Sequence, residues 1–145
     1  MASNFSANIN SFVQKTKLRA DLVLRKVALD GYHGLIDRSP VRTGRFRGNW
    51  RVGVEHPDLT TNEDKLPVGE NAAIVDTLGN VKFGDTILLT NNLDYAGVLE
   101  HGKPGAKYAD GRTAHSAQAP TGVLHNTFED LKVKLEGALQ RLDQA

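Results

Sequence analysis

The residues best suited to acid–base or metal chemistry in this chain are its five histidines. They are His33, His56, His101, His115 and His125. None has a partner at helical or zinc-ligand spacing, and the His-Glu-x-x-His pattern of zinc proteases is absent. The chain also lacks cysteine, which excludes thiolate metal sites, disulfides and a cysteine nucleophile. The sequence therefore predicts no metal centre and no cofactor.

One pair of neighbours, Glu100 and His101 near Tyr95, could form an acid–base pair. Adjacent residues on one short helical turn rarely point at a common reacting atom, and no nucleophile motif accompanies them. Ser39 and Ser116 stand outside any Gly-x-Ser-x-Gly context. A small-molecule enzyme would also need a pocket with convergent titratable groups, which the sequence does not indicate. We therefore expect no enzymatic activity.

Three guanidinium groups fall within six residues of the basic stretch 39–49, at Arg42, Arg45 and Arg47. Arginine and glycine backbone groups suit anions, so this stretch is a candidate phosphate-binding loop. It is not a P-loop, because the Gly-Lys-Ser/Thr ending is absent. The alternative interpretation is a loop that leads into a strand, with arginine stems packed on the surface.

Charge is divided unevenly along the chain. Residues 1–51 hold ten Lys and Arg against three Asp, a net charge of +7, and the remainder carries a net charge of −6. Such a division favours either nucleic-acid contact or a head-to-tail ring in which a basic face of one copy meets an acidic face of the next. The basic residues are not interleaved with aromatic residues as a single-strand binder requires, so the ring is the preferred interpretation.

The 145 residues suffice for one domain, 1–145, with a hydrophobic core. Apolar residues make up 39% and charged residues 24%, which is typical of a folded water-soluble chain. No apolar run approaches the length of a membrane span, so no membrane contact is expected. The first residues lack the pattern of a secretory signal, and we expect the protein to act where it is made or in a particle assembled there.

Two long helices are predicted from apolar residues that recur every three or four positions. The first covers residues 6–38 and ends before Pro40; the last covers 120–142, with Pro120 at its start. The apolar stripe of the first helix contains Ile9, Phe12, Val13, Thr16, Ala20, Val23, Val27 and Ala28. The stripe of the last contains Val123, Leu124, Thr127, Phe128, Leu131, Leu135, Ala138, Leu139 and Leu142.

Between these helices the pattern predicts two strands, 50–56 and 84–91, separated by a short helix, 70–78. Trp50, Val52 and Val54 alternate with polar residues and glycine, as in a half-buried strand. One or two further short strands are expected. The fold class is therefore α+β: a small antiparallel sheet packed against the long N- and C-terminal helices.

A long exposed loop is predicted after a short helical turn at 95–100. Tyr95 and Leu99 are expected to pack inward, and Gly102 ends the turn. Residues 103–118 are rich in Gly, Ala, Lys and Ser and are expected to form an extended arm. A strand, one helical turn and an exposed arm indicate a docking surface more than a catalytic pocket.

Three stretches of the chain resemble one known family. Residues 39–50, Ser-Pro-Val-Arg-Thr-Gly-Arg-Phe-Arg-Gly-Asn-Trp, resemble the Pro-Val-x-Thr-Gly-x-Leu/Phe-Arg-x-Ser/Asn-Trp signature of small neck and tail-completion proteins of long-tailed bacteriophages. Residues 84–102 resemble that family's Asn-Asn-x-x-Tyr-Ala-x-x-Leu-Glu-x-Gly, and 118–123 its Ala-Pro-x-Gly-Met-Val. Residues 103–117 form a longer insert than the family pattern has, Asp94 replaces a common Pro, and Val123 a common Met.

The resemblance implies a structural virion protein, made in the host cytoplasm and built into the neck, with no catalytic residues. It implies a tail-completion or head–tail joining protein that forms a hexameric ring between the head connector or stopper protein and the tail terminator or tail tube. Genomic DNA would pass the ring without sequence-specific contact. The predicted subunit or partner contacts are Arg42, Arg45, Arg47, Glu100, His101, Lys103, Lys107, Tyr108, Arg112 and His115. The alternatives are a tail terminator that caps the tube and a nucleic-acid-binding module that uses the basic N-terminal half.

Overall fold

The computed structural model of the chain describes residues 2–62, 72–103, 105, 107, 109, 119 and 121–144. Its helices are α1 (Ala2–Arg38), α2 (Ala72–Gly79), α3 (Ala96–His101) and α4 (Leu124–Asp143), with a 3-10 turn, η1 (Arg47–Asn49). Its strands are β1 (Arg51–Val54) and β2 (Ile87–Thr90). Helices and a small antiparallel sheet in one chain confirm the predicted α+β class.

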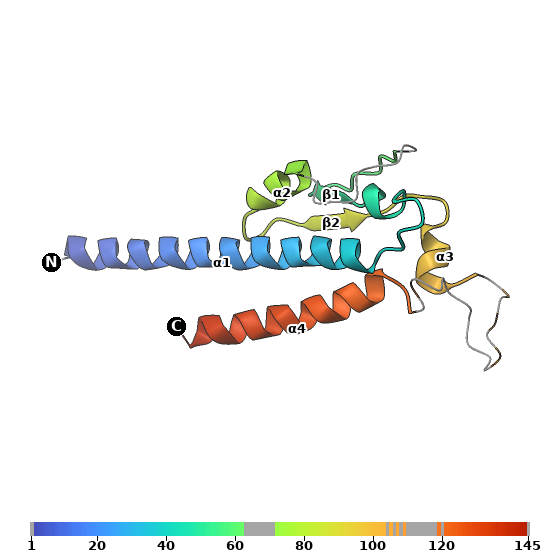
Figure 1. Ribbon diagram of the computed structural model, residues 1–145. Coiled ribbons are helices and arrows are strands. Elements are labelled where there is room, and N and C mark those ends of the chain that lie inside the picture. Colours follow the sequence, from blue (N-terminus) through green and yellow to red (C-terminus); the bar gives the residue numbers. More distant parts are fainter. Residues whose placement is uncertain are drawn as a thin grey trace.

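Helix α1 is the axis of the molecule (Figure 1). The sheet and α2 lie on one side of it, α4 runs antiparallel along another side, and the N-terminal half of α1 extends beyond both. The two strands pair antiparallel, with Arg51 opposite Thr90 and Val54 opposite Ile87. The further strands expected from the sequence are not found among the described residues, whose sheet has two strands.

The hydrophobic core gathers around the C-terminal half of α1. It combines that half-helix with the loop before β1, with α2 and with the segments that flank α3 and precede α4. Its buried apolar residues are Ala28, Tyr32, Leu35, Ile36, Phe46, Trp50, Ile74, Leu78, Val81, Leu93, Ala119 and Val123. No helix in the described ranges is both long and apolar enough to cross a membrane.

A buried hydroxyl joins α1 to the sheet. Ser39 follows the last residue of α1, and its Oγ donates a hydrogen bond to the backbone oxygen of Leu35 at 2.6 Å. The same Oγ accepts a hydrogen bond from the indole Nε1 of Trp50 at 2.8 Å. Both side chains are buried, so each polar atom is satisfied without water. This pair fixes the start of β1 against the end of the helix.

Asn49, the one fully buried amide in the loop before β1, supports the same region. Its Nδ2 donates to the backbone oxygens of Arg45 and Asn62, at 2.7 and 2.8 Å. Its Oδ1 accepts from the backbone N–H of Asn62 at 2.7 Å. The Asn49 side chain thus bonds both backbone polar groups of Asn62, as a neighbouring strand would, and joins the loop before β1 to the segment after it.

Both strands are shorter than predicted. The strand expected at 50–56 ends at Val54, because Glu55 has a positive φ of 65° that turns the chain back over Gly53. The strand expected at 84–91 begins at Ile87, because the chain is still turning at Gly84, where φ is 104° and the N–H of Asp85 donates to the backbone oxygen of Lys82. The sequence pattern identified both strands but does not record where the backbone leaves the extended conformation.

The helices also differ from prediction at their ends. Helix α1 begins at Ala2, four residues before the expected start, and ends at Arg38 as expected. The helix expected at 120–142 begins at Leu124, because Gly122 has a φ of 86°, which is incompatible with a right-handed helix; Pro120 lies outside the described residues. The helix expected at 70–78 is described from Ala72 to Gly79.

Two glycines bring α1 and α4 close together. A Cβ atom at Gly31 would lie 2.8 Å from Cδ1 of Leu131, and one at Gly34 would lie 2.9 Å from Cγ2 of Thr127. Both distances are shorter than real carbon contacts, so the side chains of α4 rest directly on the backbone of α1. Each glycine costs about 1 kcal/mol in a helix interior, and the close packing of the two helices that it allows offsets this cost.

Gly53 is the glycine whose replacement we expect to be most damaging. A Cβ at this position would lie 1.9 Å from the backbone oxygen of His56. That oxygen belongs to the turn that folds back over β1, so the turn itself must move. We predict that Gly53→Ala lowers the free energy of unfolding by roughly 1–3 kcal/mol, the usual cost of overpacking, measured by urea denaturation.

The matched control is Gly137→Ala in α4, where nothing lies within 4 Å of the added methyl group. This variant is expected to be as stable as the wild type or more stable by up to about 1 kcal/mol, because alanine favours the helix. Equal stability of the Gly53→Ala variant and the wild type would contradict the close approach at β1.

Candidate functional site

The three segments that carry the family resemblance meet at one end of the molecule, where the loop after α1, α3 and the start of α4 come together (Figure 1). The backbone oxygen of Phe46 accepts a hydrogen bond from Asn91 Nδ2 at 2.8 Å, which joins the first segment to the second. The rings of Phe46 and Tyr95 also approach, with centroids 6.1 Å apart. The second segment meets the third through Glu100.

The carboxylate of Glu100 covers the N-terminus of α4. Its Oε2 accepts hydrogen bonds from the backbone N–H groups of Val123 and Leu124, at 2.8 and 2.7 Å. Its Oε1 accepts a third from His125 at 2.8 Å. The first N–H groups of a helix lack partners within the helix and carry partial positive charge, so a carboxylate is a favourable cap. Glu100 therefore fixes where α4 begins and how it sits against α3.

This contact also determines the charge state of Glu100. Partial burial raises the pKa of the carboxyl, but the three backbone N–H groups and the nearby His101 lower it more, so the pKa lies below the ordinary glutamate value. Both oxygens are engaged by backbone donors, which leaves Glu100 a structural cap. The geometry does not place it as the base of a Glu100–His101 pair.

The three arginines of the basic loop do not converge on a common point. The Cζ of Arg45 lies 5.9 Å from the centroid of the Tyr95 ring, as in a cation–π contact. Nη2 of Arg47 lies 3.8 Å from Oδ1 of Asp37. Arg42 is exposed. The loop is therefore a surface on which two arginines are directed by neighbours within the chain.

Tyr95 does not pack inward as predicted. It is 37% exposed, at the position before α3, whereas Leu93 is buried. A turn closed by the N–H of Ala96 and the oxygen of Leu93 directs Leu93 into the core, and Tyr95 then lies over the surface of the loop. Leu99 is partly buried against the core, as expected. Gly102, with a φ of 81°, ends α3 at the predicted position.

The other predicted contact residues are divided between described and undescribed parts of the chain. His101, Lys103 and Lys107 are exposed. Tyr108, Arg112 and His115 lie outside the described residues, as does most of the predicted arm at 103–118. The role of the arm therefore stays a prediction.

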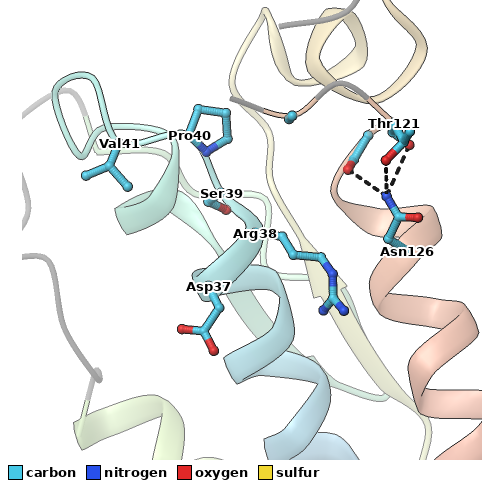
Figure 2. Close-up of a pocket in the computed structure, with 9 residues that line it drawn as sticks. Asp37, Arg38, Ser39, Pro40, Val41, Thr121 and Asn126 are labelled. Atoms are coloured by element: carbon cyan, nitrogen blue, oxygen red, sulfur yellow. Dashed lines mark hydrogen bonds between the residues drawn. The ribbon is translucent and has the colours of Figure 1, made fainter. Parts of the chain in front are cut away.

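An open cleft of about 470 Å³ lies between the end of α1 and the start of α4 (Figure 2). The polar groups on its walls already have partners: Asn126 Nδ2 donates to the hydroxyl and backbone oxygen of Thr121, and Arg38 forms an ion pair with Asp130. Figure 2 shows Asp37 directed to the other side of α1 from Arg38. Within the described ranges no group of three or more His, Asp or Glu side chains lies close enough to hold a metal ion.

The features that sequence reasoning missed are two uncovered apolar surfaces. We define the α1 stripe as Ile9, Phe12 and Val13, and the α4 stripe as Leu124, Phe128, Leu135 and Leu139. All seven side chains are at least 39% exposed. The sequence showed the periodic spacing of these residues, and from it we predicted that each helix buries its apolar face. In the structure these seven side chains are exposed instead. Helix α4 covers α1 only beyond the α1 stripe, and α1 contacts α4 through the neighbouring face that contains Thr127 and Leu131.

The chain matches no protein-family model, no curated protein and no solved structure. The grounds for a function are therefore the sequence resemblance, the contacts between the three segments that carry it, and the exposed α1 and α4 stripes.

The cap on α4 predicts a stability that depends on pH. Because folding lowers the pKa of Glu100, its contribution is fully present above the ordinary glutamate pKa and is lost as the pH falls through the lowered value. We predict that Glu100→Gln lowers the free energy of unfolding by about 1 kcal/mol at neutral pH, as for other helix caps. The difference from the wild type should disappear in acid, measured by urea denaturation across the pH range.

Glu136→Gln is the control, because Glu136 is an exposed carboxylate within α4. It should change stability little at any of these pH values. A Glu100→Gln deficit that is the same in acid as at neutral pH would show that the charge of the cap is not what stabilises α4.

Proposed function

We propose that this chain is a structural protein of the bacteriophage neck, a tail-completion or head–tail joining protein that forms a ring between the head connector and the tail tube. The observation that carries the proposal is the meeting of residues 39–50, 84–102 and 118–123, the three stretches that resemble the neck-protein family. They are separated in sequence, yet they are joined by the Asn91–Phe46 hydrogen bond and by the cap of Glu100 on α4.

Contact between the three stretches strengthens the resemblance. Three short coincidental matches would have no reason to touch one another. In this chain the signature residues instead form one unit: Ser39 bonds Trp50, the Trp50 ring packs edge-on against Phe46 with centroids 5.7 Å apart, and Glu100 caps α4. The contacts between these positions support the view that they act as one folding unit and not as three separate motifs.

The exposed surfaces support a protein whose work is assembly. Soluble monomers rarely expose large contiguous apolar patches, and such patches are typical of interaction sites. The α1 stripe and the α4 stripe together present seven large apolar side chains. The division of charge between residues 1–51 and the rest of the chain suits contact between different faces of neighbouring copies.

In this function the chain performs no bond chemistry. The ring holds head and tail together, and its neighbours would be the connector or stopper on one side and the tail terminator or tube on the other. The exposed Arg42, His101 and Lys103, at the end where the three stretches meet, are the described candidates for contact with those neighbours. DNA would pass the ring through contacts without sequence specificity.

The first test is the size of the purified protein, by native mass spectrometry and by electron microscopy. We expect closed rings, hexameric if the family pattern holds. In a second preparation, residues 103–117 are replaced by a short Gly-Ser linker. This variant should have the same helical circular dichroism spectrum as the wild type but should not form rings. The linker can be short because Gly122 approaches Glu100 closely: a Cβ at Gly122 would lie 2.9 Å from the backbone oxygen of Glu100.

Normal rings from the linker variant would refute a role for the predicted arm in assembly. A wild-type protein that stays monomeric at all accessible concentrations would contradict the ring itself. Binding of duplex DNA by the monomer, weakening steeply between low and moderate salt, would instead favour the nucleic-acid-binding alternative.

A further inference from the structure

The N-terminal half of α1 projects from the rest of the molecule (Figure 1). Every residue from Ser6 to Arg19 is exposed. The first hydrogen bond between α1 and another element involves Asp21, whose Oδ1 accepts from the N–H of Phe83 at 2.6 Å. About 19 residues of helix, roughly 28 Å at 1.5 Å per residue, therefore extend beyond the core.

A projecting helix of this kind needs a partner. Isolated helices of this length are marginal in water, and most helical stability in proteins comes from packing of an apolar face. The α1 stripe supplies such a face: Phe12 is 70% exposed, Ile9 46% and Val13 39%. Its spacing, i, i+3 and i+4, places the three side chains on one side of the helix. Nothing in the described part of the chain covers that side.

A groove suited to such a helix lies elsewhere on the molecule, between α1, β2 and α4. It has a volume of about 490 Å³ and is mainly apolar. Its lining includes Leu24 and Val27 from α1, Ile87 and Leu89 from β2, and Leu124 and Phe128 from α4. Phe128 is 66% exposed, and the α4 stripe continues along the helix through Leu135 and Leu139. We call this lining, with the continuation of the stripe, the α4 groove.

We infer that the projecting half of α1 from one copy of the chain occupies the α4 groove of a second copy. An amphipathic helix whose apolar face lies in a hydrophobic groove is a common mode of protein recognition. The α1 stripe and the α4 groove would then cover each other. The inference deepens the proposed function, on which it rests for the closure of the ring, because it names the contact that would join the subunits.

Charge favours a second copy as the occupant. The projecting segment carries Lys15, Lys17 and Arg19 and no acidic residue before Asp21. Asp85 lines the α4 groove, whereas Glu129 and Glu136, each one residue after a member of the α4 stripe, lie about 100° round the helix from it. Lys132, four residues after Phe128 and three before Leu135, lies on the side of α4 next to the α4 stripe and offsets part of this contrast. Lys132 is exposed, but Lys134 is directed toward α1, with its Nζ 3.8 Å from Asp30 Oδ2.

Within this chemistry, the projecting half can reach only the groove of another copy. Helix α1 is continuous from Ala2 to Arg38, and the α4 groove runs beside its C-terminal half, so the projecting half cannot fold back into its own groove. The donor and acceptor surfaces are also different. Contacts between unlike surfaces join copies head to tail and give a ring when the rotation closes.

The test uses one substitution in each surface, Phe12→Ser in the α1 stripe and Phe128→Ser in the α4 groove. Both side chains are more than 60% exposed, so we expect the monomer to fold normally, checked by thermal melting. Each change should weaken self-association at least about tenfold in sedimentation velocity, as loss of a central apolar anchor does. Leu18→Ser and Val133→Ser are the controls; their side chains are 62% and 69% exposed on other sides of the same helices, and they should leave association unchanged.

Mixing the two defective variants gives the decisive result. The Phe12→Ser chain retains an intact groove and the Phe128→Ser chain an intact α1 stripe, so one productive contact remains between them. The mixture should therefore form a one-to-one heterodimer that cannot grow, although neither variant associates alone.

Three other outcomes separate this inference from the proposed function. Loss of association in only one of the two variants would indicate symmetric pairing of a single surface and would overturn the inference. Normal rings from both variants would overturn it and leave the proposed function standing. A heterodimer from the mixture together with open filaments from the wild type would support the contact and contradict the closed ring.

Discussion

The buried hydroxyl of Ser39 joins the longest helix to the sheet, and the loop between them depends on it. Ser39 Oγ holds the last turn of α1 through Leu35 and the first residue before β1 through Trp50. Because an unsatisfied buried indole N–H is costly, the loop between Ser39 and Trp50 must close in one way. That closure places Phe46 in the core and Asn49 where it can bind the backbone of residue 62. The Ser39 hydroxyl therefore uses its hydrogen and one of its two lone pairs to join the helix to the strand.

At the same end, charge adds to the packing of Leu93, Ala119 and Val123 in the core. The Glu100 carboxylate lies across the first turn of α4, so α3 and α4 are joined by three backbone N–H groups. Together, the Ser39 contacts and this cap join α1 to the start of β1 and α3 to α4 at one end of the molecule. The projecting end of α1 has no comparable contacts in the described residues. One end of the molecule thus holds the three segments that resemble the neck-protein family, joined by hydrogen bonds. The other end is the projecting half of α1, which carries exposed apolar side chains.

Local chemistry predicted several features of this fold. Pro40 marked the end of α1, Gly102 marked the end of α3, and alternation identified β1. The Glu100 cap was beyond reach, because it joins a carboxylate to N–H groups more than twenty residues later, and no local pattern encodes such a contact. The directions of Arg45 and Arg47 were equally hidden, since they depend on Tyr95 and Asp37. The stripes show the limit of periodicity: it identifies the residues that share a face, but not whether anything covers that face.

The bare backbone at Gly31 and Gly34 has a consequence for the surface of the molecule. Because Leu131 and Thr127 rest on it, these two positions determine how near the axis of α4 comes to that of α1. The same spacing sets the distance from Phe128 to β2. Larger residues at either glycine would move α4 outward as a body and widen the α4 groove, without altering any side chain that lines it. The fit of this surface to an incoming helix can therefore be tuned from the interior.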